Sequence, residues 1–213
     1  MVNYTEAIKR PFSDIKTLAV GILISIIPIV NFIAMGYMLK CAKTAMAGKK
    51  PLPEWEAYGN LFVKGVVAAL IALAYVIIPV LIIGISLGTA ILSYFGGVAA
   101  GMMGGAGSMA AIGSAGIGII VGGILYLIAM YFIPAALMNY AKTEQASSAF
   151  KLREVFKKAL SVDYLIVWLV VAVYAMILGV ITSIIPIIGF GISSFVVGVT
   201  AFTLFGELYL KEK

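Results

Sequence analysis

Five continuous apolar runs, separated by short polar segments, organise the chain. Apolar residues follow one another within each run without the alternation of a half-buried strand, so the pattern favours helices. Each run approaches or exceeds the roughly 20 residues that a helix needs to cross a bilayer, and lipid permits only helices or closed barrels. We therefore predict an all-α, polytopic helical integral membrane protein. The runs are Leu18–Leu39, Gly65–Leu87, Ile117–Leu137, Tyr164–Ile185 and Ile187–Leu210.

The polar segments between the runs predict short elements at the membrane surface. Interfacial amphipathic segments are expected near residues 1–16, 48–62 and 143–160 of a single transmembrane helical domain, 1–213. Gly48 predicts a helix stop. Pro53, followed by acidic residues that favour the positive end of a helix dipole, predicts the next helix start.

One word occurs twice, as SIIPIVNF at Ser25–Phe32 inside the first run and as SIIPIIGF at Ser183–Phe190. Pro186 ends one helix or begins the next, and Gly189 relieves crowding, so a tight hairpin turn is predicted there. If Pro28 forms the same turn, the first run is a re-entrant helical hairpin. The alternative is one kinked span, since proline also occurs within membrane helices; we favour the hairpin. Its arms are Ser13–Ile27 and Ile29–Ala47.

The segments that lead into the two hairpins also resemble each other. AIKRPFSD at Ala7–Asp14 matches VFKKALSVD at Val155–Asp163 with one insertion. A basic amphipathic lead-in, an apolar arm, the SIIP turn and a second arm therefore occur near both ends of the chain. We interpret the two hairpins as an internal duplication with both copies in the same orientation.

Basic residues distinguish the two sides of the predicted membrane protein. They cluster in the N-terminal segment and in the connections after the first and third runs, whereas the second SIIP turn carries none. By the positive-inside rule, the charged loops and the C-terminus of this multi-pass cell-membrane protein are predicted to be cytoplasmic. The net charge of +6 then indicates contact with anionic lipid headgroups rather than nucleic acid. The predicted headgroup residues are Lys40, Lys43, Lys49, Lys50, Lys151, Arg153, Lys157 and Lys158.

The composition agrees with lipid as the main solvent and removes several kinds of chemistry. The 213 residues are 63% hydrophobic and 11% charged, whereas about a quarter of a soluble domain is charged. Histidine is absent and Cys41 is the single cysteine, so we expect no metal site, no cofactor and no intrachain disulfide. Neighbouring lysines could lower the pKa of Cys41, although a lone interfacial cysteine is more often inert.

No set of residues in the sequence predicts catalysis. All nine acidic residues fall at the end of an apolar run or outside it, so the middle of the predicted membrane is free of carboxylates. Glu54 beside Trp55 is the most site-like pair, and a helix start explains it as well. We interpret Glu207 as an interfacial anchor and expect no enzymatic activity.

Glycines four residues apart predict close helix packing. Small residues at this spacing let two helices approach each other in lipid, within one chain or between copies. The segment Ser93–Gly123 is uncharged and rich in glycine. We favour a helical seam broken near Gly104–Gly107, and a loose apolar loop is the alternative. The predicted packing residues are Gly84, Gly88, Gly97, Gly101, Gly105, Gly118 and Gly122.

Several words resemble a known family. The second half carries IPAALMNYAKTEQASSAF at Ile133–Phe150, DYLIVWLV at Asp163–Val170 and IPIIGF at Ile185–Phe190. The first half carries GYMLKCAKTAMAGKKPLPEW at Gly36–Trp55. The chain resembles a family of prokaryotic polytopic membrane proteins, common in archaea, that is catalogued as domain of unknown function 4013. The resemblance implies an integral membrane protein and brings no activity and no functional residues.

The sequence as a whole favours a non-enzymatic membrane scaffold. Such a protein would self-associate through glycine faces or organise partners, with a basic face on anionic lipid. The alternative is a small transporter or channel built on the duplicated SIIP hairpins. A water-filled cavity lined by both SIIP turns would favour transport, whereas a dry interior and glycine-faced oligomer contacts would favour the scaffold.

Overall fold

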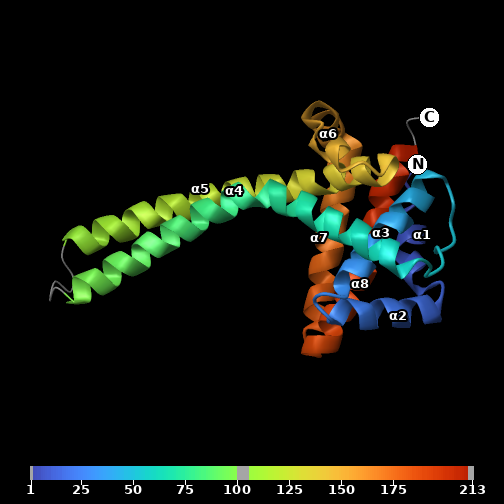
Figure 1. Ribbon diagram of the computed structural model, residues 1–213, viewed down its shortest axis with the longest axis horizontal. Helices are drawn as coiled ribbons and strands as arrows, with labels where there is room; N and C mark the ends of the chain where they lie inside the picture. The colour runs from blue at the N-terminus through green and yellow to red at the C-terminus, as the bar shows by residue number, and fades with distance from the viewer. Residues whose placement is uncertain (1, 100–105, 211–213) are drawn as a thin grey trace. The chain divides into compact units, whose positions relative to one another are not determined.

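The computed structural model describes residues 2–99 and 106–210, and these residues form helices and turns without a strand (Figure 1). Contacts divide the chain into two compact units, with Met1–Ile71 and Phe132–Lys213 in unit 1 and Ala72–Tyr131 in unit 2. Two long helices, α4 (Tyr58–Ala99) and α5 (Ala106–Thr143), contribute residues to both units. The single-domain organisation stays a prediction.

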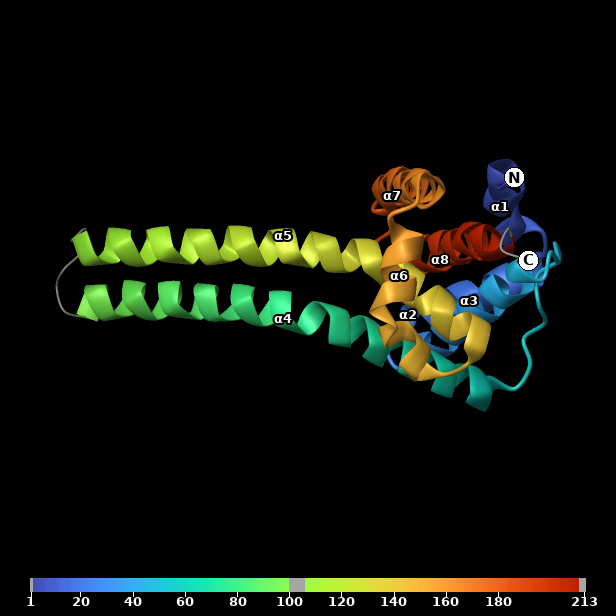
Figure 2. The same cartoon turned by 90° about the horizontal axis from the view of Figure 1, so that it is seen from above.

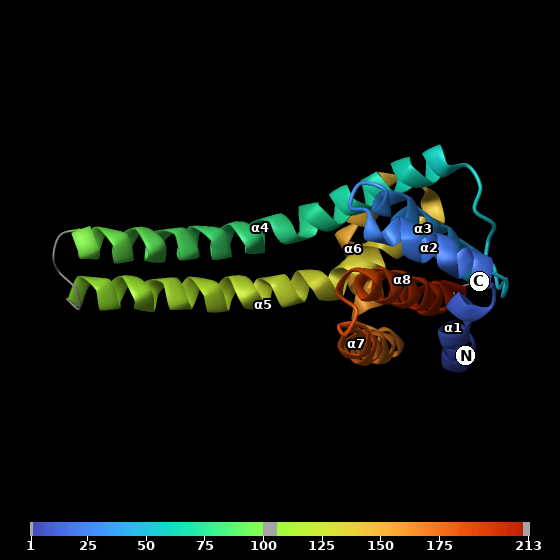
Figure 3. The same ribbon diagram turned by 90° about the horizontal axis from the view of Figure 1, so that it is seen from below.

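Unit 1 is built around α8 (Pro186–Leu210). This helix lies between α7 on one side and α2 and α3 on the other (Figures 2 and 3). Glycines of α8 make these approaches close: Gly191 lies against α2, and Gly198 and Gly206 lie against α3. The other elements are α1 (Tyr4–Lys9), η1 (Arg10–Phe12), α2 (Ile15–Ile26), α3 (Asn31–Met46), η2 (Ala146–Phe150), α6 (Leu152–Ala159) and α7 (Val162–Thr182).

The first apolar run is broken into two helices at the SIIP word, as the hairpin requires. Helix α2 ends at Ile26, and α3 begins at Asn31. Ile27 is extended (φ −90°, ψ 115°), the conformation to which a following proline, here Pro28, restricts a residue. The Ile27 carbonyl accepts a hydrogen bond of 2.7 Å from the Asn31 N–H. The proline therefore stands in the first turn of the second arm; the re-entrant path in a membrane stays a prediction.

The second SIIP word makes the same turn. Pro186 is the first residue of α8, and the Ile185 carbonyl before it accepts a hydrogen bond of 2.6 Å from the Gly189 N–H. Gly189 also lies against the Thr182 carbonyl of α7, so that a Cβ at this position would overlap the backbone. Both turns thus use the same donor–acceptor spacing relative to their proline.

The lead-ins support the duplication and show one difference between the copies. The Arg10 guanidinium donates to the carbonyl of Cys41, thirteen residues after the proline of its turn, and the matching Lys158 ammonium donates to Leu208, twenty-two residues after its proline. The first arms have 12 and 21 residues. Both differences are nine residues, and the internal duplication stays a prediction.

The connection between α3 and α4 ends one helix as expected and begins the next later than expected. Gly48 has a left-handed φ of 72°, and the Lys49 N–H bonds to the Thr44 carbonyl, which forms a Schellman motif. The helix start predicted at Pro53 is wrong, because the chain is not helical until Tyr58. The Tyr37 hydroxyl bonds the Pro53 carbonyl at 2.8 Å and holds the segment against α3.

The interfacial segment predicted near residues 143–160 contains two short helical elements. It forms the short 3-10 helix η2 and the separate amphipathic helix α6. A break at Lys151, whose φ of −73° and ψ of 76° are not helical, divides the two.

Unit 2 is a pair of helical segments, residues 72–99 of α4 and 106–131 of α5, which lie side by side (Figures 1 and 2). Gly118 lies against Ser86, and Gly122 lies against Ile83 and the Pro79 carbonyl. The glycine-rich segment is therefore helical up to Ala99 and from Ala106 onward. The break predicted near Gly104–Gly107 falls partly outside the described residues.

Within unit 1, α3 and α4 approach closely at two glycines that were not among the predicted packing residues. A Cβ on Gly36 would overlap the Leu61 carbonyl, and a Cβ on Gly65 would overlap the Phe32 carbonyl. Both obstacles are backbone atoms, which cannot move aside as a flexible side chain could.

We predict that Gly65→Ala destabilises unit 1 by about 1–3 kcal/mol, because the added methyl forces α3 and α4 apart. Gly59→Ala, in the same helix, meets open space, and alanine is the better helix former there. Thermal unfolding of the two variants in detergent measures the difference. Equal stability of Gly65→Ala and Gly59→Ala would contradict the close α3–α4 approach.

Candidate functional site: the basic end of unit 1

Arg10 is the most buried charged residue among the described residues, with 4% of its surface exposed. Its guanidinium makes no ion pair there and donates instead to neutral oxygens. One terminal nitrogen reaches Thr203 of α8 at 2.9 Å, and the other reaches Thr44 of α3 at 2.7 Å and the Pro51 carbonyl at 3.0 Å. The planar fork of arginine suits this arrangement, since one group cross-links η1, α3, the following connection and α8.

The LPEW word is packed against the core through its tryptophan. Trp55 stacks on Tyr37, with ring centroids 3.9 Å apart and planes 14° apart, and the Phe195 ring of α8 lies 5.9 Å from Tyr37 and 6.1 Å from Trp55. The Trp55 indole N–H donates to the Thr17 carbonyl of α2 at 3.3 Å. Glu54 is exposed, and its backbone carbonyl accepts from the Lys40 ammonium at 2.8 Å. The Glu54–Trp55 pair therefore holds this connection against α2 and α3.

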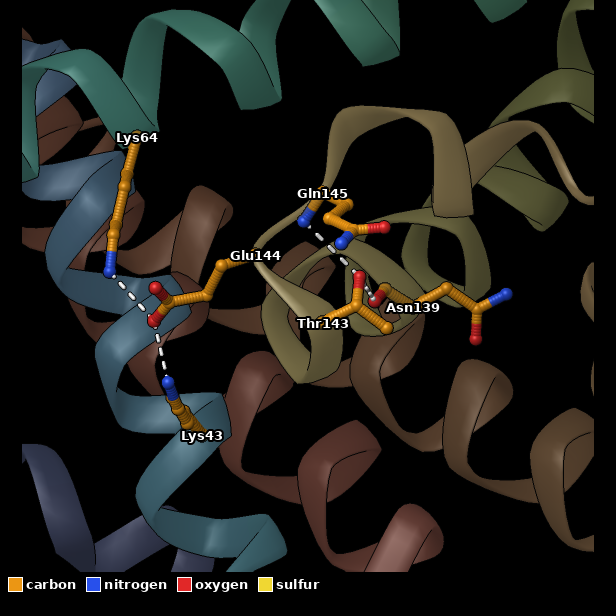
Figure 4. A network of polar contacts seen from close by, with 6 residues as sticks. All are labelled: Lys43, Lys64, Asn139, Thr143, Glu144 and Gln145. Carbon is orange, nitrogen blue, oxygen red and sulfur yellow. Dashed lines mark hydrogen bonds and ion pairs between the residues drawn. The ribbon is translucent and has the colours of Figure 1, made fainter.

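Glu144 joins two lysines from different helices (Figure 4). One of its oxygens lies 2.5 Å from Lys43 Nζ of α3 and 2.9 Å from Lys64 Nζ of α4. Hydrogen bonds from Lys43 and Lys64 lower the pKa of Glu144 to about 2. The residue has a left-handed φ of 57°, which costs a non-glycine residue roughly 1–2 kcal/mol. The two ion pairs offset part of that strain.

A cavity of about 260 Å³ lies beside this network. It is lined by the lysines at positions 40, 43 and 64 and by two carboxylates, Glu56 and Glu144, so one positive charge is in excess. Tyr140 and Ala141, from the PAALMNYA word, also line it. The family-like words at Gly36–Trp55 and Ile133–Phe150 are far apart along the chain, and both contribute residues to the lining of this cavity.

The predicted headgroup residues fall at this end of unit 1, and several of them have partners within the chain. Lys40 pairs with Glu56 at 3.8 Å, Lys50 with Glu6 at 3.1 Å and Lys151 with Glu154 at 3.4 Å. The Lys158 ammonium bonds the Leu208 carbonyl and lies 4.5 Å from the Tyr209 ring centroid. The exposed members are Lys43, Lys49, Lys50, Lys151, Arg153 and Lys157. Their contact with lipid stays a prediction.

The predicted packing glycines have different surroundings. Gly118 and Gly122 lie at the α4–α5 contact, whereas a Cβ on Gly84 or Gly88 would meet no described atom within 4 Å. Gly101 and Gly105 lie outside the described residues, as do the surroundings of Gly97. The glycines of α8 were missed, because they recur at seven and eight residues rather than four. A search for glycines on one helical face would have found them.

The structure also shows the surroundings of Cys41 and Glu207, two residues considered in the sequence analysis. Cys41 is fully buried, and burial raises the pKa of its thiol to about 12, which outweighs the lowering by nearby Arg10 and Lys40. Glu207 accepts a hydrogen bond of 2.7 Å from the Asn3 N–H and borders a second cavity of about 260 Å³ with Arg10. Glu54, the other carboxylate considered as a site residue in the sequence analysis, does not line that cavity.

The fold defines the class of protein. Within the described residues, four helices are long and apolar enough to cross a membrane, in an all-α polytopic architecture. They are Tyr58–Gly96, Ala115–Thr143, Val162–Thr182 and Pro186–Tyr209. Residues 19–187 match the family described as Protein of unknown function (DUF4013), and the chain belongs to that family. No curated protein and no solved structure matches the chain.

We predict that Arg10→Lys lowers the free energy of unfolding by about 2 kcal/mol or more, because a single lysine ammonium cannot reach the acceptors of both terminal guanidinium nitrogens. Arg153→Lys, at an exposed position, should change it by less than about 0.5 kcal/mol. Unfolding in detergent, followed by intrinsic fluorescence, compares them. Equal effects would show that Arg10 does not cross-link unit 1.

We predict that Glu144→Gln destabilises the protein by about 1 kcal/mol near neutral pH, a modest value because the side chain is 44% exposed. The folded pKa lies below the ordinary value of 4.5, so the contribution is complete above pH 4.5 and disappears as pH falls toward 2. Melting temperatures of both proteins between pH 7 and pH 2 test this. A difference that stays constant with pH would contradict it, and Glu154→Gln is the control.

Proposed function

We propose that the protein is a non-enzymatic membrane scaffold, held by anionic lipid at its basic end and self-associating through helix faces of unit 2. The observation that carries the proposal is the filled interior of unit 1. Tyr37, Phe195 and Val199 are fully buried in one core cluster, with Trp55 packed on it. Such packing supports a rigid body better than a path for solutes.

The distribution of charge supports a lipid-facing role for the basic end. The ion pairs formed by Glu6, Glu56, Glu144 and Glu154 lie in the lead-ins and connections, outside the four apolar spans. The exception is Lys64, which pairs with Glu144 from near the start of the first span. By the positive-inside rule these segments and the C-terminus face the cytoplasm. Anionic headgroups would neutralise the remaining positive charge.

A small transporter or channel is the second candidate, and the shared geometry of the two SIIP turns favours it. The cavities described above lie at the basic end and are lined by neither turn. Flux of a small ion through proteoliposomes, above that of protein-free vesicles, would support transport and overturn the scaffold.

Self-association can be tested without disturbing the fold. Leucine at Gly84 and Gly88 meets no described atom of the same chain, so we predict that the double variant keeps its melting temperature and loses self-association. Energy transfer between labelled copies in liposomes measures the association.

Gly179→Leu is the matched control, since this glycine of α7 also faces open space in an apolar helix. It should associate as the unaltered protein does. Unchanged energy transfer in the Gly84→Leu/Gly88→Leu protein would remove the glycine faces from the proposal.

A further inference from the structure

A third cavity of unit 1, of about 570 Å³, lies where the end of α5, α6 and the end of α8 meet. Cavities of this size accommodate small ligands. Its lining is strongly basic. The residues that matter are Asn139, Lys142, Glu154, Lys157, Lys158 and Tyr209.

The positive charge of this cavity is only partly compensated. Three lysines face one carboxylate, Glu154, which is already paired with Lys151 at 3.4 Å. Among the described residues, neither Lys142 nor Lys157 forms an ion pair. An anion between them would relieve the mutual repulsion of the ammonium groups.

Asn139 supplies a second, independent observation. Its side chain is 6% exposed, and its Nδ2 has no hydrogen-bond partner in the described part of the chain. The Tyr209 hydroxyl lies 3.1 Å from Asn139 Oδ1 and 3.2 Å from the Ala135 carbonyl. A buried amide donor without an acceptor is costly, so an acceptor in the cavity would satisfy it.

Neighbouring polar groups in the described part of the chain have other partners. Figure 4 shows the Asn139 side chain directed away from Glu144, whose carboxylate is engaged by Lys43 and Lys64. The Thr143 hydroxyl bonds the Asn139 backbone carbonyl and Ser148. The amide therefore faces a basic cavity that offers donors and few acceptors.

We propose that this cavity binds a phosphate group, with the lysine ammonium groups supplying charge and the Asn139 amide supplying a directed hydrogen bond. Phosphate oxygens accept several charge-assisted hydrogen bonds at once. A divalent cation does not fit, because lysines outnumber carboxylates. The inference rests on the lipid part of the proposed function and is independent of self-association.

A phospholipid headgroup and free phosphate share this chemistry. The neighbouring helix α6 exposes Leu152, Phe156 and Leu160, an apolar surface that suits the membrane interface. Titration of the detergent-purified full chain with phosphatidylglycerol, phosphatidylcholine or inorganic phosphate, followed by native mass spectrometry and melting temperature, distinguishes the sources.

We expect Asn139→Leu, and separately Lys142→Gln/Lys157→Gln, to weaken phosphatidylglycerol binding about tenfold. Lys9→Gln/Lys16→Gln, with the same charge change at exposed positions, should alter it less than about twofold. Asn139→Leu should retain its melting temperature, since an unpaired amide is removed. Competition by inorganic phosphate would identify a soluble phosphate ligand. Lack of such competition would identify a lipid headgroup.

Unchanged binding of both phosphatidylglycerol and phosphate in the cavity variants would overturn the inference while leaving lipid binding elsewhere intact. If the unaltered protein shows no preference for phosphatidylglycerol over phosphatidylcholine, the lipid part of the proposed function fails as well. The lysine double variant keeps the test decisive if Asn139→Leu does not fold.

Discussion

The hydrogen bonding of one buried guanidinium holds the basic end of unit 1 together. Arg10 has no carboxylate partner among the described residues, and burying a charge is costly unless its donors are satisfied. Its two terminal nitrogens have acceptors, whereas its Nε has none in the described part of the chain. Its acceptors come from α3, α8 and the connection after α3, so they are in place only when those segments pack together. Arg10 and its partner Thr203 also line one of the cavities described above.

Much of the architecture follows from patterns that the sequence displays directly. Continuous apolar runs predict helices because lipid leaves the backbone no other hydrogen-bond partners. The recurrence of SIIP predicts two turns, since proline restricts the residue before it and fits the first helical turn after it. Gly48 ends α3 for a related reason, because glycine adopts a positive φ without strain.

The candidate site is less predictable, because it depends on contacts between segments distant in sequence. Nothing near Glu144 indicates that it will join Lys43 and Lys64, or that its backbone will be left-handed. Pro53 looked like a helix start, but the bond from Tyr37 keeps that segment extended. Glycine spacing did not predict the close α3–α4 contacts at Gly36 and Gly65 for the same reason, because those contacts depend on which helices meet.

The unequal first arms of the two hairpins have a geometric consequence. At 1.5 Å per residue, nine residues correspond to about 14 Å along a helix axis. A first arm of 12 residues is too short to cross the roughly 30 Å of hydrocarbon, whereas one of 21 residues is long enough. Identical words would then occupy two different solvents, and the shallower one would need protein neighbours to shield its exposed peptide groups.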